Sequence, residues 1–70
     1  MPKPLVVLYE ECNGGPCPKV FEDADGQIVV QGSLVEDQDV LERTTPAGHE
    51  RVVRIPRDVL LEAARALEAM

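Results

Sequence analysis

The two cysteines of the chain have the type and spacing best suited to chemistry. Cys12 and Cys17 flank the sequence Asn-Gly-Gly-Pro. If that stretch is a tight hairpin loop, the cysteines face each other and can be thiols, a disulfide or half of a zinc site. A tetrahedral zinc site needs four ligands, and His49 is the only other soft ligand, so a second copy of the chain would have to complete it. Because thiols persist in reducing compartments, we expect the two cysteines to be structural thiols. One alternative is a zinc site at Cys12, Cys17 and His49, and the other is a disulfide or redox role.

The sequence contains no strong catalytic motif. Nucleophilic catalysis would need His49 as its base, and nothing in the sequence places His49 near either thiol. No triad, glycine-rich phosphate loop or metalloprotease motif is present. The sequence Asp-Ala-Asp-Gly at 23–26 is like part of a calcium loop, but the alignment puts Phe21 and Gly32 where oxygen ligands are needed. We therefore expect a hairpin turn there, and no enzymatic activity.

The charge distribution suits a basic protein partner better than a nucleic acid. The first 42 residues carry nine acids and two lysines, for a net charge of -7, and the remainder carries five arginines and four acids, for +1. Arg51 and Arg54 would point to opposite faces of a strand, and no aromatic residues interleave to stack bases. We expect the arginine cluster of 43, 51, 54 and 57 to be solvated charge, with contact to an acidic surface as the alternative, and no direct nucleic-acid binding.

Short apolar runs separated by turn signals predict a series of strands. Gly26 is placed to take the left-handed conformation of a turn, and Gly32 indicates a bend or bulge inside a strand. The Asn13-Gly14 pair is typical of a hairpin. The expected strands cover about residues 4–10, 17–22, 27–35, 40–44 and 50–55.

The end of the chain predicts a single amphipathic helix over about residues 56–69. Pro56 suits the first turn of a helix, and Asp58 would interact favourably with the helix dipole. Leu60, Ala63, Leu67 and Met70 recur at spacings of three and four, so they share one face, which we expect to pack as core. The predicted fold is α+β, a small antiparallel sheet of four to five strands with one C-terminal helix, in a single domain over residues 1–70.

Two strands present apolar side chains on both faces. Residues 5–8 and 28–30 are apolar without alternation, whereas one helix covers only one face of a sheet. We expect a second copy of the chain to cover the other face, so that the protein is a homodimer; a sheet curled into a small barrel is the alternative. The chain is too short to leave much room for a ligand inside a barrel. The expected interface comprises Leu5, Val7, Ile28, Val30, Leu60 and Leu67.

The sequence predicts a cytoplasmic protein. No run approaches 18 apolar residues, so we expect no membrane span. The first apolar stretch is short and is followed at once by Glu10 and Glu11, unlike the apolar region of a signal peptide.

Several segments together resemble a known family. A Cys-Pro-Lys-Val-Phe sequence at 17–21 opens a hairpin, a valine-rich strand returns after Gly26, and the strand at 52–56 leads into a helix. Over roughly residues 17–67 this layout resembles the small actinobacterial proteins of the BldB type, which are single domains often associated with helix-turn-helix regulators of the WhiJ kind. The resemblance implies a dimeric regulatory accessory protein without enzymatic activity, contacting a basic DNA-binding regulator.

The sequence thus favours a small regulatory or adaptor protein that acts by protein–protein contact. A small zinc- or thiol-dependent module that uses Cys12 and Cys17 is the alternative. The two differ in whether the cysteines are needed for more than the fold.

Overall fold

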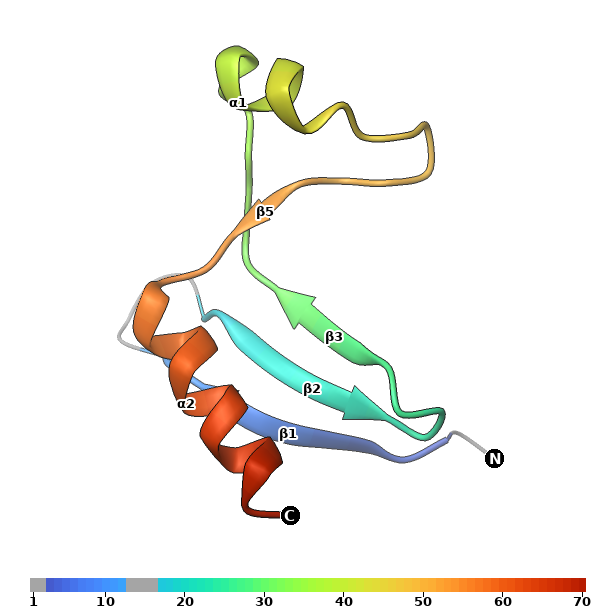
Figure 1. Ribbon diagram of the computed structural model, residues 1–70, viewed down its shortest axis with the longest axis vertical. Helices are drawn as coiled ribbons and strands as arrows, with labels where there is room; N and C mark the ends of the chain where they lie inside the picture. Colours follow the sequence, from blue (N-terminus) through green and yellow to red (C-terminus); the bar gives the residue numbers. More distant parts are fainter. Residues whose placement is uncertain (1–2, 13–16) are drawn as a thin grey trace.

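The computed structural model describes residues 3–12 and 17–70 and consists of a small sheet, a covering helix and an extended arm. Figure 1 shows the C-terminal helix lying across the sheet and the arm leaving the far end of the third strand. The main sheet is antiparallel with strand order β1-β2-β3, and a second, two-stranded antiparallel sheet joins β4 to β5. The elements are β1 (Leu5–Glu10), β2 (Lys19–Asp23), β3 (Ile28–Gln31), β4 (Ser33–Leu34), α1 (Gln38–Thr44), β5 (Val53–Arg54) and α2 (Arg57–Glu68).

The hairpin between β2 and β3 forms for the reason the sequence indicates. The carboxylate of Asp23 accepts hydrogen bonds from the backbone N–H groups of Asp25 and Gln27, both at 2.9 Å. Gly26 has φ of 79°, a conformation that glycine adopts without steric cost. The backbone N–H of Asp23 also donates to Gln27 O at 2.9 Å, which closes the turn and fixes the register of the two strands. The predicted turn at 23–26 is confirmed.

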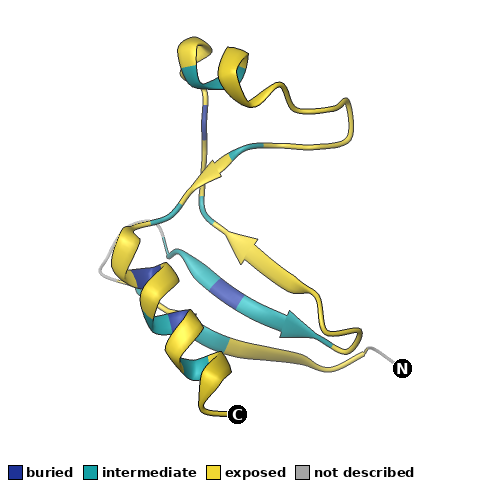
Figure 2. Ribbon diagram, in the orientation of Figure 1, coloured by how far each residue is buried: buried dark blue, intermediate teal, exposed yellow. Residues whose placement is uncertain are grey.

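The hydrophobic core lies between α2 and one face of β1 and β2. Val59 is fully buried, and Ala63 is 3% exposed; both pack against Val20 of β2, which is 2% exposed. Leu8 and Tyr9 of β1 pack around this cluster. In Figure 2 the buried colour on the sheet and the helix is confined to these few positions.

The helix itself is close to the prediction of 56–69. Pro56 is its N-cap, and Asp58 lies in its first turn. Of the predicted apolar stripe, however, only Ala63 is buried: Leu60 is 57% and Met70 72% exposed. The prediction that this stripe packs as core was wrong. The helix rests on β1 and β2 through the face that carries Val59 and Ala63, so the stripe projects beyond the covered strands.

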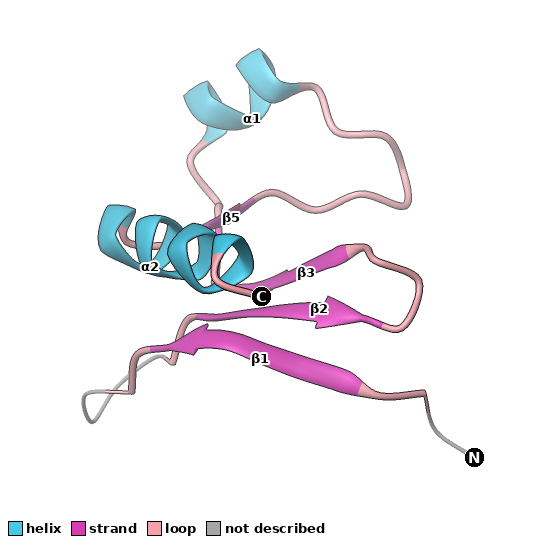
Figure 3. Ribbon diagram, turned by 60° about the horizontal axis from the view of Figure 1, so that its bottom comes forward, coloured by secondary structure: helices cyan, strands magenta, loops and turns pink. Residues whose placement is uncertain are grey.

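Residues 33–54 form the arm, which comprises β4, α1, the following loop and β5. Figures 1 and 3 show it standing away from the sheet. Within the arm, Val35 is 5% exposed, and its N–H donates to Val52 O at 2.9 Å. The Cα radius of gyration of the protein is 13.6 Å, whereas a compact domain of 70 residues has about 11 Å. The arm therefore makes the chain more extended than a compact domain.

The prediction of a strand at 40–44 was wrong, because these residues belong to α1. Asp37 is the helix N-cap, and its carboxylate accepts from Asp39 N–H at 3.0 Å. An ion pair of 3.5 Å joins Asp39 to Arg43 one turn later. Thr45 ends the helix in the left-handed conformation, and Pro46 follows, a common stop signal. These local capping signals outweigh the strand preference of Val40 and its neighbours.

Two further strand boundaries differ from expectation. The strand predicted at 27–35 is divided at Gly32 into β3 and β4, and the strand predicted at 50–55 shrinks to two residues. The α+β class, the antiparallel pairing and the C-terminal helix are confirmed. The sheets are open at both sides, so the described strands do not curl into the barrel considered as an alternative.

Gly32 is required where the arm leaves the sheet. A Cβ atom at this position would collide with the carbonyl oxygen of Arg54 and lie 2.8 Å from Cγ2 of Ile55. We expect Gly32→Ala to reduce the free energy of unfolding by about 1–3 kcal/mol, since backbone must move to make room. Gly48→Ala, where nothing lies within 4 Å, is the matched control and should change little. Urea unfolding followed by circular dichroism measures both; equal stabilities would contradict the close approach of Gly32 to β5.

Candidate functional site

Cys12 and Cys17 form a disulfide at the loop end of the β1–β2 hairpin, where β1 leads into β2. Their Cα atoms are 4.4 Å apart, within the range that disulfides span. Glu10 pairs with Lys19, and the N–H of Glu11 donates to Pro18 O at 3.1 Å, so the same register brings the two cysteines directly opposite each other. The expectation of structural thiols is therefore wrong for this structure, and the disulfide alternative applies. The predicted Asn13-Gly14 turn lies outside the described residues.

The structure does not bring His49 to the cysteine pair. His49 lies in the turn that follows α1, within the arm, whereas the cysteines close the end of the β1–β2 hairpin. Across residues 3–12 and 17–70, no three His, Cys, Asp or Glu side chains gather as metal ligands. A zinc site at Cys12, Cys17 and His49 thus remains a prediction that needs reduced cysteines and a different placement of His49.

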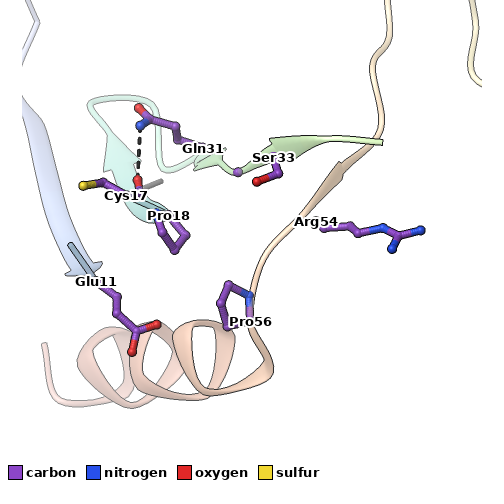
Figure 4. Close-up of a pocket in the computed structure, with 8 residues that line it drawn as sticks. Glu11, Cys17, Pro18, Gln31, Ser33, Arg54 and Pro56 are labelled. Carbon is purple, nitrogen blue, oxygen red and sulfur yellow. Dashed lines mark hydrogen bonds between the residues drawn. The ribbon is translucent and has the colours of Figure 1, made fainter. Parts of the chain in front are cut away.

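An open cavity of about 500 Å³ lies beside the disulfide, where the sheet, the arm and the start of α2 meet. In Figure 4 the sulfur of Cys17 points away from the cavity, and the side chain of Arg54 extends outward. The amide of Gln31 donates from Nε2 to Cys17 O at 3.2 Å. The polar groups diverge, whereas small-molecule sites rely on a few convergent ones. The lining residues are Glu11, Cys17, Pro18, Gln31, Gly32, Ser33, Arg54 and Pro56.

Acidic side chains gather where the end of β1 meets the first turns of α2. Partial burial, followed by the charge of Asp58 and a side-chain hydrogen bond with it, raises the pKa of Glu11 above its ordinary value. Burial raises the pKa of the Tyr9 phenol as well, and the nearby charges of Glu11, Asp58 and Glu62 add to it. The helix packs here at an electrostatic cost once Glu11 is ionised.

This arrangement predicts a pH dependence of stability. A carboxyl whose folded-state pKa is raised binds its proton more tightly in the folded protein, so its contribution is favourable at low pH and is lost as pH rises through the raised value. We expect Glu11→Gln to remove this loss, so that the stability of the variant relative to wild type increases between about pH 4 and pH 7. Chemical unfolding at several pH values measures the difference. A stability difference that does not change with pH would contradict the raised pKa of Glu11, which partial burial and the neighbouring Asp58 cause.

The face of the main sheet opposite α2 is apolar and uncovered. Val20 contacts α2, so its neighbour Phe21 lies on the other face, between its cross-strand partners Val7 and Val29. Val7 is 50% and Val29 40% exposed. Figure 3 shows that α2 covers one face of β1 and β2, and this is the face that carries Val20 and not Phe21.

On the helix side, α2 leaves β3 uncovered. Ile28 is 45% and Val30 40% exposed, and Leu60 and Leu67 of α2 project toward this open strip. A shallow apolar groove of about 140 Å³ follows the same strip, lined by Leu8, Val20, Ile28, Leu60, Ala63, Ala64 and Leu67. The structure thus exposes all six residues predicted for an interface, divided between the two faces.

Sequence periodicity missed Val59 as the centre of the core, because Val59 lies beside the apolar stripe of α2 rather than in it.

The arginines are engaged in local contacts on the surface. Arg54 forms an ion pair of 3.9 Å with Asp37, across the base of the arm. Arg51 donates to the carbonyl oxygens of Gly48 and Glu50, at 3.1 and 2.7 Å. These exposed contacts fit the expectation of solvated charge.

Comparison with protein-family models, with curated proteins and with solved structures gave no match. Within the described ranges, neither helix has the length and apolar character needed to cross a membrane.

Proposed function

We propose that the chain is a small, non-enzymatic regulatory or adaptor protein that acts by protein–protein contact as a homodimer. The observation that supports this is the imbalance between core and surface. Among the described residues, four hydrophobic side chains are buried, whereas twelve large ones are 38–72% exposed. Exposed apolar surface on this scale typically marks an interaction site.

The total surface area supports the same proposal. The accessible area is 5482 Å², whereas a folded monomer of 7.7 kDa exposes about 4,300 Å². The difference exceeds the roughly 800 Å² that each partner contributes to an interface of standard size. A second copy of the chain would cover part of this excess.

The regulatory part of the proposal rests on charge and on the resemblance to BldB-type proteins. The net charge of -6 favours a basic partner through long-range attraction. A helix-turn-helix regulator is such a partner, and the proposal places the protein beside one in the cytoplasm. The arm, which carries Glu36, Asp37, Asp39 and Glu42, offers acidic surface away from the apolar faces.

Native mass spectrometry of the purified protein tests the homodimer. We expect a dimer at micromolar concentration, because association covers apolar surface that one α2 leaves open. A monomer at concentrations up to 100 µM would contradict it.

A pull-down from the native cytoplasm tests the adaptor role. The wild-type chain should recover a basic DNA-binding protein, and recovery should weaken as salt rises. Failure to recover any specific partner would contradict the proposal. A double variant, Asp39→Asn with Glu42→Gln, tests whether the acidic arm contributes to binding of the partner.

A thiol-dependent module is the second candidate, and the Cys12–Cys17 disulfide favours it. In the reducing cytoplasm such a pair would open to two thiols, which can bind zinc or exchange with other thiols.

Replacing both cysteines by serine distinguishes the structural role of the disulfide from further chemistry. We expect the double variant to be about 2 kcal/mol less stable than the oxidised wild type, because a short closed loop restricts the unfolded chain by roughly that amount. Urea unfolding measures this, and equal stability would contradict a stabilising disulfide. If the double variant also matches the reduced, zinc-supplied protein in melting temperature, the thiol-dependent module is excluded.

A further inference from the structure

The outer edge of β3 presents unpaired backbone groups. The hydrogen bond from Asp23 N–H to Gln27 O fixes the alternation along β3. Val29 and Gln31 therefore point their backbone groups toward β2, and Ile28 and Val30 point theirs away from the sheet. Among the described residues, no strand lies on that side of β3.

The two edges of the main sheet differ in how they are protected. Edge strands are commonly blunted by bulges, prolines or charged residues. β1 has a bulge between Val7 and Tyr9, is preceded by Lys3 and Pro4, and ends at Glu10. β3 has the sequence Ile-Val-Val-Gln, without charge, proline or bulge. Of the two edges, β3 is the one left open to pairing with another strand.

From these observations we infer that two copies of the chain associate antiparallel through their β3 edges. The inference rests on the homodimer proposed above and names its interface. Val29 would lie opposite the partner's Val29, and Ile28 opposite the partner's Val30. This register places the outward backbone groups of both strands opposite each other and matches apolar residues on both faces. Moving the centre to Val30 would instead put Val29 opposite Gln31.

The paired edges join the two main sheets into one continuous sheet, to which each copy contributes three strands. The two-fold axis of an antiparallel pair is perpendicular to the sheet, so both α2 helices lie on the same face. The exposed side chains of Leu60 and Leu67 from each copy then flank the apolar strip over β3. The pairing covers surface that accounts for part of the excess area of the single chain.

A charge exchange at the two-fold axis tests this interface. Val29→Lys places two lysines directly opposite each other, and Val29→Glu two glutamates, so each variant should raise the dimer dissociation constant at least tenfold. Mixing the two variants should restore a heterodimer, because the opposite charges then face each other. Val7→Lys is the matched control: Val7 has similar exposure on the same face but lies on the protected edge strand, so this variant should stay dimeric. Sedimentation equilibrium and native mass spectrometry measure the four samples.

Hydrogen exchange of the wild-type protein tests the same pairing without substitution. The amides of Ile28 and Val30 should become protected as the protein concentration rises, because they gain partners only in the dimer. If the wild type is dimeric but Val29→Lys does not weaken it, or if these two amides exchange freely in the dimer, the β3 interface is overturned and the proposed homodimer uses another surface. A wild-type protein that is monomeric would overturn the proposed homodimer itself.

Discussion

The fold depends on the contact between α2 and the middle strand of the sheet. Val59 and Ala63 pack on Val20, and these three side chains are the buried cluster that holds the helix to the sheet. Fully burying a valine contributes on the order of 1.5–3 kcal/mol, and burying an alanine contributes less. Such a cluster is a small driving force for a chain of this length. In the arm, Val35 is the one further buried hydrophobic side chain. Because this core covers so little, many large apolar side chains of the sheet and of α2 stay exposed.

A disulfide supports the small core, and the proposed association would add to that support. While it is oxidised, the Cys12–Cys17 disulfide closes the β1–β2 hairpin on which α2 rests, so it restricts the unfolded chain at the strands that form the core. Association would act differently, by removing from water the apolar side chains that α2 leaves exposed. A partner that binds only the folded chain links association to folding, so the proposed interface would contribute to stability as well as to function.

Much of the fold could be predicted from local sequence signals. Gly26 and Asp23 specify the β2–β3 turn, and Pro56 and Asp58 mark the start of α2, so those elements lie within about two residues of their predicted bounds. The helix at 38–44 was missed because a strand was predicted at 40–44, although aspartate, here Asp37, is a favoured helix N-cap. Periodicity identified an apolar stripe on α2 but not which side would meet the sheet, since that depends on tertiary packing. The cysteine spacing allowed a disulfide, but only the strand register places the two Cα atoms opposite each other.

The central claim is that the single chain is incomplete and that association finishes its apolar core. The dependence of thermal stability on protein concentration tests it most directly. If dimerisation is linked to folding, the melting temperature of the wild-type protein will rise by several degrees as its concentration increases a hundredfold, because mass action favours the folded dimer. A melting temperature that stays constant over that range would contradict the account and show that the small core around Val59 is sufficient alone.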